Sequence, residues 1–302
     1  MRGGRVRDAN TMAVKLSESQ LPQLLLWLQP YLPTTFKLYG DLKSHLQGKF
    51  PDVDFFVDRW PDPQAVSAVV DPAGDQLESK VFLGKINLGM FGVNDKALVD
   101  LLKDKRLVDW NKPAVLSFVP GSFWPAAMTL MEEKKVGPLQ PEPVLMLKAT
   151  RQNLKQIPVP EGMKISPVTE DVVDVVNSTW KFICEGSDLY IRDLVRHQPS
   201  VFLTMEDGQH VGHMLGNSYG AMGMLYIQPH FRRKGYAKVI VSQLAAKYFE
   251  EGCDVYVMIE EDNEKSINLH HSVGFKTVPN FKVAWMRTVP KTCEPRSPKC
   301  CV

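Results

Sequence analysis

An apolar strand that ends in a basic, glycine-containing turn and continues directly into a helix constrains this chain more than any other feature. It spans residues 226–241, and the helical positions 239, 240, 244 and 248 are apolar. A turn of this kind directs several backbone N–H groups outward at a helix N-terminus, where the helix dipole favours an anion. Arg232, Arg233 and Lys234 add positive charge at the same place. The pattern predicts a phosphate-binding site, and a pyrophosphate fits its size.

The spacing within the turn separates several kinds of phosphate site. A Walker A loop needs a Gly-Lys-Ser/Thr ending, and a dinucleotide fingerprint needs three glycines in a βαβ unit; neither is present. Arg232-x-x-Gly235-x-Ala237 instead resembles the Q/R-x-x-G-x-G/A signature of the GNAT superfamily of acyltransferases. In that superfamily the signature binds the pyrophosphate of coenzyme A. The alternative is a solvated basic turn before an ordinary surface helix, since short motifs recur by chance.

Composition excludes several other classes of protein. The 302 residues are enough for two domains, and 36 Lys+Arg against 34 Asp+Glu give a net charge of +2. A dedicated nucleic-acid binder usually has a larger basic excess. No apolar run reaches the roughly 20 residues of a membrane span. The five cysteines include two isolated ones, which argues against a disulfide framework, and we expect no metal site.

The proline-rich stretch between residues 138 and 160 predicts a boundary near 150–161 between two halves of mixed helices and strands; the alternative is that these prolines lie in loops of a single continuous sheet. We predict a disordered N-terminus (1–15), an N-terminal domain (16–155), a C-terminal domain (156–290) and a disordered tail (291–302). In the first half the patterns predict helices over 17–32, 95–103 and 123–133, and strands over 35–39, 54–57, 65–70, 81–87, 114–119 and 144–148. In the second half they predict strands over 163–166, 201–205, 209–214, 225–228, 254–259 and 282–287, and helices from 169, 188, 236 and 263.

The order β–α–α–β–β–β–α–β–α–β in the second half resembles the GNAT topology. A second segment, Asn263-x-x-Ser-Ile-x-Leu-His270-x-x-x-Gly-Phe275, resembles the superfamily's N-x-x-A-x-x-L-Y-x-x-x-G-F. In the first half, Phe36-Lys-Leu-Tyr-Gly40 and Val57-Asp-x-Trp-Pro-Asp62 resemble the N-terminal domain of glycine N-acyltransferases. The fold class implied is α+β, a mixed central sheet with flanking helices: a GNAT-like fold in the C-terminal half and a smaller, related α+β N-terminal half.

The resemblance implies an enzyme that transfers an acyl group from acyl-CoA, its co-substrate, to the amino group of glycine or a similar small amine. No permanently bound cofactor is implied, and we expect a monomer located in mitochondria, with the cytoplasm as the alternative. His270 stands where the superfamily often places a tyrosine acid beside the CoA sulfur; a non-catalytic histidine is the alternative. The residues implied in CoA binding are Tyr226, Ile227, Arg232, Arg233, Lys234, Gly235, Tyr236, Ala237 and Asn263.

The general base is missing from the expected position. Glycine N-acyltransferases resemble one another in a glutamate just before the strand that leads into the signature, and here that position is Ala221. Glu260, Glu261 and His213 are substitutes that could act through water. Two other functions therefore stay open: acetylation of a protein lysine or another amine, and a non-catalytic acyl-CoA binder.

Overall fold

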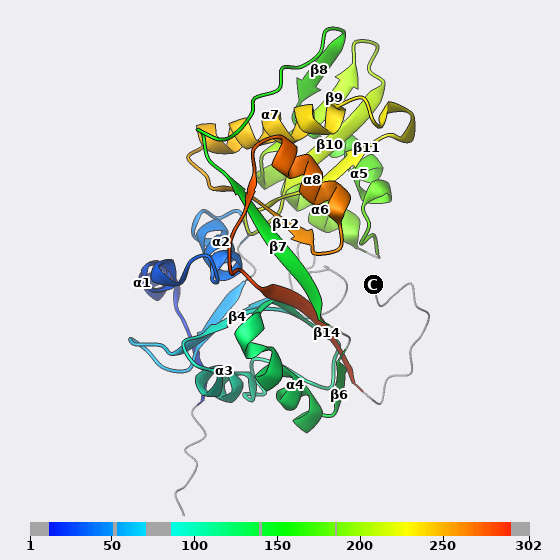
Figure 1. Cartoon of the computed structure of the whole chain (residues 1–302). Helices are drawn as coiled ribbons and strands as arrows, with labels where there is room; N and C mark the ends of the chain where they lie inside the picture. Colours follow the sequence, from blue (N-terminus) through cyan, green and yellow to red (C-terminus); the bar gives the residue numbers. More distant parts are fainter. Residues whose placement is uncertain (1–11, 51–52, 71–85, 139–140, 185, 291–302) are drawn as a thin grey trace, which may run out of the picture.

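A single mixed sheet runs through the whole molecule, and helices flank it (Figure 1). The computed structural model describes residues 12–50, 53–70, 86–138, 141–184 and 186–290. Within these ranges the sheet has 14 strands, 12 of them in one continuous order, β1-β2-β3-β4-β5-β14-β7-β12-β11-β10-β9-β8. The predicted α+β class is confirmed.

The N-terminal half begins with two helices and continues with alternating strands and helices. Its elements are β1 (Val14–Lys15), α1 (Leu21–Leu28), α2 (Phe36–Leu46), β2 (Asp54–Val57), β3 (Ala65–Val70), β4 (Ile86–Gly92), α3 (Asp95–Leu102), β5 (Ala114–Pro120), α4 (Trp124–Glu133), β6 (Val136–Pro138) and β7 (Glu142–Ala149).

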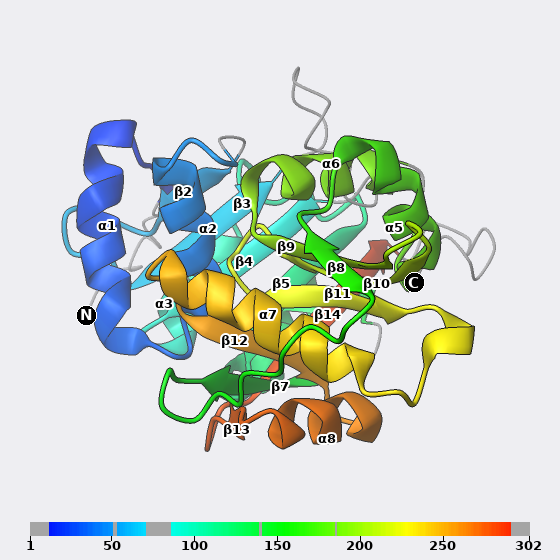
Figure 2. The same ribbon diagram turned by 90° about the horizontal axis from the view of Figure 1, so that it is seen from above.

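The C-terminal half repeats this order of elements. It contains β8 (Met163–Ser166), α5 (Val173–Thr179), α6 (Ser187–His197), β9 (Ser200–Met205), β10 (His210–Gly216), β11 (Met222–Ile227), α7 (Tyr236–Glu250), β12 (Val255–Glu260), α8 (Glu264–Ser272), β13 (Lys276–Thr277) and β14 (Val283–Pro290). The predicted order of strands and helices in this half is confirmed. Figure 2 shows α7 lying across β10, β11 and β12, and its buried side chains join those of the strands in one apolar cluster.

The two halves are topological repeats that exchange their last strands. In the first, β2, β3 and β4 are antiparallel neighbours, and α3 connects β4 to a parallel β5. In the second, β9, β10 and β11 follow the same plan, and α7 connects β11 to a parallel β12. After α4 the chain passes through the short β6 to β7, which pairs with β12 of the other half. After α8 it passes through the short β13 to β14, which pairs with β5. The domain boundary predicted near residue 155 stays a prediction, because the sheet is continuous across it.

One element of the N-terminal half differs from its prediction. The predicted strand over 35–39 is instead the N-cap, Thr35, and about the first turn of helix α2. The aromatic residues favoured a strand, but Leu38 and Leu42 lie one helical turn apart and are both fully buried. Near the N-terminus, Val14–Lys15 form β1, which pairs with β2. Residues 1–11 and 291–302 lie outside the described residues, as do residues 71–85, which include most of the predicted strand 81–87.

The V-D-x-W-P-D segment closes the hairpin between β2 and β3. Asp58 Oδ1 accepts hydrogen bonds from the backbone N–H groups of Gln64 (2.8 Å) and Ala65 (2.9 Å). Trp60 packs against the apolar cluster beneath α1 and α2. These contacts explain the segment as a packing element.

Candidate active site

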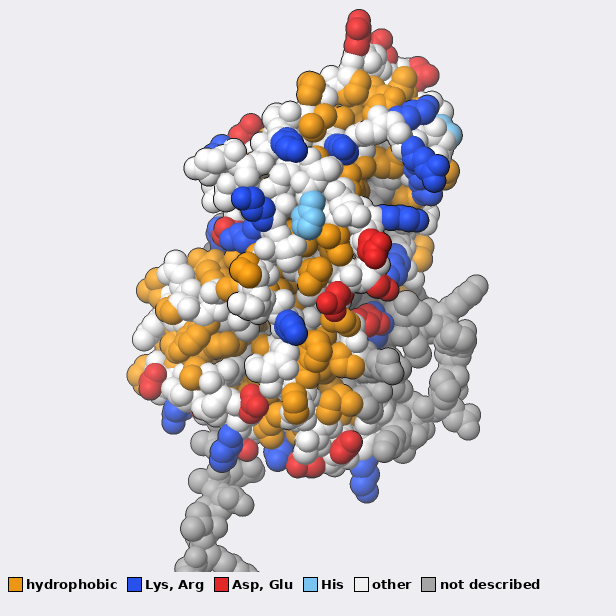
Figure 3. All heavy atoms as spheres, viewed as in Figure 1, with side chains coloured by type: hydrophobic (Ala, Val, Ile, Leu, Met, Phe, Trp, Pro, Cys, Tyr) orange, Lys and Arg blue, Asp and Glu red, His pale blue; other side chains and the backbone are white. Residues whose placement is uncertain are grey.

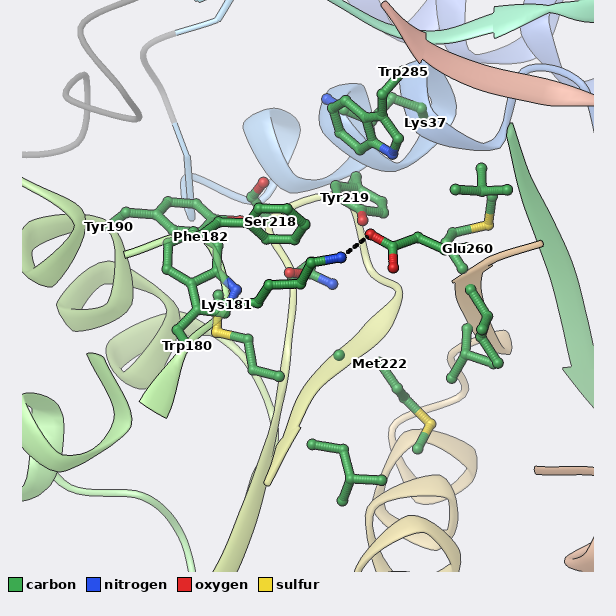
Figure 4. Close-up of a pocket in the computed structure, with 18 of the residues that line it drawn as sticks. Lys37, Trp180, Lys181, Phe182, Tyr190, Ser218, Tyr219, Met222, Glu260 and Trp285 are labelled. Atoms are coloured by element: carbon green, nitrogen blue, oxygen red, sulfur yellow. Dashed lines mark hydrogen bonds and ion pairs between the residues drawn. The ribbon is translucent and has the colours of Figure 1, made fainter. Parts of the chain in front are cut away.

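A cavity of about 430 Å³ lies between the two halves, and both contribute to its walls. Figure 4 shows side chains from α2, from the segment after α5 and from the β10–β11 connection pointing toward one another across it. The ends of β11 and β12, the first turns of α8 and part of β14 complete the lining. The site is therefore built by the whole chain rather than by its C-terminal half alone.

The strands β11 and β12 separate at this cavity. They are parallel neighbours, yet only Met222 and Val257 are paired between them. The equivalent strands of the N-terminal half, β4 and β5, are joined by four consecutive pairs from Ile86–Ala114 to Gly89–Ser117. The same topology is thus closed in one half and open in the other, which leaves backbone groups of β11 without a strand partner on that side.

A bulge in β11 contributes to the separation. The register between β10 and β11 shifts between His213 and Leu215, and the residue opposite, Met224, has φ +54°. A bulge bends its strand and increases the local twist. Leu225 and Tyr226, which follow the bulge, both line the cavity.

The predicted anion-binding turn follows β11 directly. Gly235 has φ +86° and is the residue before α7. The helical hydrogen bonds of α7 begin where the backbone N–H groups of Lys238 and Val239 donate to the Gly235 carbonyl. Residues 233–237 therefore precede the first helical hydrogen bond, as expected for a helix N-terminus that binds an anion. The left-handed conformation of Gly235 explains why glycine is needed there.

The basic side chains of the turn are exposed. Arg232 Nε donates to the Ile227 carbonyl at 3.0 Å, and its guanidinium lies 5.7 Å from the Tyr226 ring centre. Lys234 Nζ lies 5.5 Å from the Phe231 ring centre. Figure 3 shows Lys and Arg side chains gathered at the upper right of the molecule, on the side where α7 begins in Figures 1 and 2. Ile227 itself is absent from the cavity lining, and its carbonyl is occupied by Arg232.

The equivalent turn in the N-terminal half is built differently. Asn94 precedes α3, its side chain accepts a hydrogen bond from the Ala97 N–H, and Asp95 occupies the first turn of the helix. A carboxylate at that position repels an anion. Of the two equivalent turns in the described residues, the one at Gly235 alone keeps the features predicted for anion binding.

His270 lies in α8 at the cavity wall and is 2% exposed. Its Nδ1 donates to the Ser266 carbonyl at 2.8 Å, and its buried Nε2 has no hydrogen-bond partner among the described residues. Burial lowers the pKa of this imidazole, so the neutral form is favoured. In that form the Nε2 atom carries a lone pair.

Asn263 and Glu260 also line the cavity. Asn263 is the N-cap of α8, since its Oδ1 accepts a hydrogen bond from the Ser266 N–H at 3.2 Å. Glu260 forms an ion pair with Lys181 across the cavity (Figure 4). Glu261 is exposed and lies outside the lining, so the structure brings only one of the two candidate glutamates to the site.

Ala221 points away from the cavity. It is completely buried in an apolar cluster with Phe36, Met146 and Tyr256. The neighbouring Met222 and Gly223 line the cavity, and Ala221 does not. His213, the third candidate base, is on the lining and 1% exposed.

Sequence reasoning missed four charged residues of the cavity, which lie on α2, β7 and β14. Lys37 and Asp41 form a buried ion pair on α2, and burial raises the pKa of the Asp41 carboxyl against the opposing effect of Lys37. Arg287 of β14 pairs with Glu142 of β7 at 2.6 Å. All four line the cavity. The i,i+4 spacing of Lys37 and Asp41, parallel to that of Leu38 and Leu42, is a helical signal that could have identified them.

Comparison with known proteins agrees with this geometry. The FR47-like protein family model matches residues 202–286. An acetyltransferase of Pectobacterium atrosepticum is 31% identical over 127 residues, which cover 38% of this chain and 89% of that protein. The chain belongs to the GNAT superfamily of N-acyltransferases.

Similarity within the superfamily extends over the N-terminal half. Bos taurus glycine N-acyltransferase is 22% identical over 299 residues, 93% of this chain and 99% of the bovine protein. A solved Drosophila protein has the same fold with a TM-score of 0.78 at 18% identity, covering 93% of this chain and 99% of that one. The chain is therefore a glycine N-acyltransferase-like member of the superfamily and an enzyme of the N-acyltransferase class, and acyl-CoA is the co-substrate that this superfamily implies.

The described residues were found to lack two further features. They contain no group of three or more His, Cys, Asp or Glu side chains arranged for a metal ion. None of the helices in the same residues combines the length and apolarity needed to cross a membrane.

Proposed function

We propose that this enzyme transfers an acyl group from acyl-CoA to the amino group of glycine or a similar small amino acid. The observation that carries the proposal is the open gap between β11 and β12, which joins an anion-binding turn at one end to a cavity enclosed by both halves. Similarity to the bovine glycine N-acyltransferase along the whole chain supports the same acceptor class.

The cofactor is assigned to the C-terminal half. The amides of residues 233–237 bind the pyrophosphate, and the side chains of Arg232, Arg233 and Lys234 add charge. The pantetheine arm lies in the gap and bonds to backbone groups of Leu225 and Tyr226, with Asn263 beside it. A backbone N–H of β11 then polarises the thioester carbonyl and stabilises the oxyanion that forms on attack. Tyr236 and Ala237 contribute through their backbone, as the first two residues of α7.

The acceptor is assigned to the cavity, and its walls favour a small zwitterion over a protein lysine. Helix α2 and strands β4, β5 and β14 line the cavity on the side opposite the gap between β11 and β12. Three ion pairs line it, Lys37–Asp41, Lys181–Glu260 and Arg287–Glu142. Paired charges of both signs suit a molecule that carries an ammonium and a carboxylate.

His270 is assigned a proton transfer to the leaving group. Because Nδ1 donates to Ser266, the neutral Nε2 first accepts a proton from the nitrogen of the tetrahedral intermediate. It then donates that proton to the CoA sulfur as the C–S bond breaks. His270 therefore acts as an acid only after it has accepted a proton from the substrate.

An acylation screen tests the proposal. Purified protein is incubated with acetyl-, butyryl- and benzoyl-CoA and with glycine, other amino acids or a lysine peptide, and products are identified by mass spectrometry. Formation of an N-acyl amino acid supports the proposal, and exclusive acylation of the peptide refutes it. Thermal protection by CoA without any product would establish a non-catalytic acyl-CoA binder instead. We also propose a monomer, which light scattering tests. The family resemblance supports a mitochondrial location, which fluorescence microscopy of the tagged protein tests.

A further inference from the structure

Four rings from the neighbouring strands β9, β10 and β11 form a stack beside the cavity. Phe202, His210, His213 and Tyr226 lie in this order, with ring-centre separations of 4.3 Å, 5.2 Å and 5.7 Å between neighbours. The first two rings are parallel within 2°, and the two imidazoles within 9°. The stack holds both imidazoles in fixed orientations.

A chain of polar contacts runs through the same two imidazoles. His213 Nε2 lies 3.4 Å from Thr179 Oγ1, His213 Nδ1 lies 3.2 Å from His210 Nε2, and His210 Nδ1 lies 3.2 Å from Gln228 Nε2. Thr179 Oγ1 donates to the Val176 carbonyl at 2.9 Å, so the hydroxyl accepts from His213 in the resting state. Each imidazole then accepts at Nδ1 and donates at Nε2, and every member of the chain is satisfied.

The chain has one end in the cavity and the other near solvent. His213 is 1% exposed and lines the cavity, whereas His210 and Gln228 are half-buried. His213 is paired in register with Tyr226 of β11, the strand to which the proposed function assigns the thioester. The inner imidazole thus lies one strand away from the reacting carbonyl.

We propose that His213 is the general base of this enzyme and that His210 relays the proton from it to solvent. This inference rests on the proposed function and supplies the base that the family places at the position of Ala221. His213 is the catalytic residue of the pair, because it faces the space assigned to the amine. His210 acts through His213 and is a positioning and relay residue.

The step transfers one proton along the chain without oxidation or reduction. The step starts from the opposite tautomers, with a proton on Nδ1 of each imidazole and none on Nε2, which the two rings reach by exchange with water before the amine binds. The substrate ammonium loses a proton to His213 Nε2 beside Thr179, while His213 Nδ1–H passes its proton to His210 Nε2 and His210 Nδ1–H releases one to water. The transfer leaves each imidazole protonated on Nε2, as in the resting state. The freed electron pair forms the C–N bond, and the C–S bond then breaks with its electrons leaving on sulfur. A second proton, lost from the same nitrogen, goes to the sulfur. Acyl-CoA and an ammonium therefore give an amide, CoA thiol and one released proton.

The surroundings keep both imidazoles neutral and ready to accept. Burial, and to a smaller degree His210, lowers the pKa of His213 to about 3, and burial lowers the pKa of His210. The facing groups are Thr179 of α5, Phe202 of β9 and Tyr226 of β11, and the charged groups of the cavity are its three ion pairs. A residue with so low a pKa does not store a proton, but a relay does not require storage, because each imidazole gives up one proton as it receives another.

Three variants in the full-length protein test the relay: His213→Gln, His210→Ala and, as a matched control, His271→Gln on the exposed face of α8. We expect His213→Gln to lower kcat at pH 7 about 100-fold, within the range for loss of a general base, while CoA protects it thermally as it protects the wild type. The deficit should shrink as pH rises, because more of the amine is already unprotonated. We expect His210→Ala to lower kcat about tenfold and added imidazole to restore it, and His271→Gln to retain full activity.

The outcomes separate the relay from the proposed function. A wild type that forms no product with any amine overturns the proposed function, and the relay with it. An active wild type whose His213→Gln variant stays within twofold at every pH overturns the relay alone. A His210→Ala variant whose deficit is independent of both pH and imidazole assigns His210 a structural role and overturns the relay. If His213→Gln is not protected by CoA, His213→Asn is measured under the same criterion.

Discussion

Gly235 separates the two physical requirements of the anion-binding turn, its backbone conformation and its charge. The residue has φ +86°, and a Cβ added there meets no heavy atom within 4 Å. Gly235→Ala therefore costs only the conformational strain of a left-handed residue, about 1–2 kcal/mol. We expect this variant to lower thermal stability and to weaken CoA binding by at most about tenfold.

The pair Gly235→Glu and Gly235→Lys then isolates the charge, because both carry the same strain. A unit charge about 6 Å from a phosphate in water interacts by about 0.7 kcal/mol, so a pyrophosphate with two charges gives about 1.4 kcal/mol, attractive for Lys and repulsive for Glu. The difference of about 2.8 kcal/mol falls by roughly half at physiological ionic strength. We expect Gly235→Glu to bind CoA about tenfold more weakly than Gly235→Lys in 0.15 M salt, with a larger ratio at low salt.

Isothermal titration calorimetry with CoA and with pantetheine measures how the strain and the charge at position 235 each change the affinity. Pantetheine has no pyrophosphate, so its affinity should be the same for the Glu and Lys variants. Equal CoA affinities for the two variants, or a ratio that does not change with salt, would refute the assignment of the pyrophosphate to this turn.

Three further outcomes follow from contacts elsewhere in the molecule. Ala221→Glu, which restores the family's glutamate, should destabilise the protein and give no gain in rate, because Ala221 is fully buried in an apolar cluster; a variant with wild-type melting temperature and a higher kcat would contradict this. Gly40→Ala should destabilise the protein by about 1–3 kcal/mol despite the better helix propensity of alanine, because the alanine Cβ would meet the Tyr219 carbonyl oxygen at 2.0 Å. Urea denaturation measures the change in unfolding free energy, and a stabilised variant would be inconsistent with this packing. The Asp104 carboxylate accepts hydrogen bonds from Arg106 and from the Ala13 N–H, and the Arg106 hydrogen bond lowers the pKa of this carboxyl. The stability that Asp104 contributes is therefore present at neutral pH and is lost as the pH falls below the unfolded-state pKa near 4. Asp104→Asn should flatten the acidic side of a curve of unfolding free energy against pH, and an unchanged curve would contradict this contribution.

The cofactor side of the site could be predicted because its determinants are local in the sequence. The turn at 232–237 combines a strand end, a left-handed glycine and a helix start within a dozen residues, and all three follow from residue type. Asn263 as an N-cap and His270 on the same helix are local in the same way. The prediction of a mixed sheet with these elements in this order rested on the same kind of signal.

The acceptor side depends on contacts between residues far apart in the sequence. Ser44 Oγ donates to the Ser218 carbonyl at 2.6 Å, across 174 positions, and holds α2 against the wall of the cavity. The aromatic pattern over 35–39 favoured a strand, and only the packing of Leu38 and Leu42 decides for a helix. The hydrophobic periodicity of the sequence also cannot predict the exchange of β7 and β14, because the exchange depends on which strand each of them pairs with.

The repeat suggests how one chain came to divide its tasks. In the N-terminal half the parallel pair is closed by four pairings, and an acidic residue starts the following helix. The features to which we assign acyl-CoA binding in the other half are therefore both absent from the equivalent position. Its helix α2 instead packs on the connection before β11, so closely that a Cβ at Gly40 would overlap the Tyr219 carbonyl oxygen. Because β14 joins that half to the sheet while carrying Arg287 into the cavity, the acceptor wall and the cofactor cleft are parts of one continuous sheet. Acceptor choice should therefore follow substitutions in α2 and β14, and acyl-CoA affinity those in β11 and the turn at Gly235.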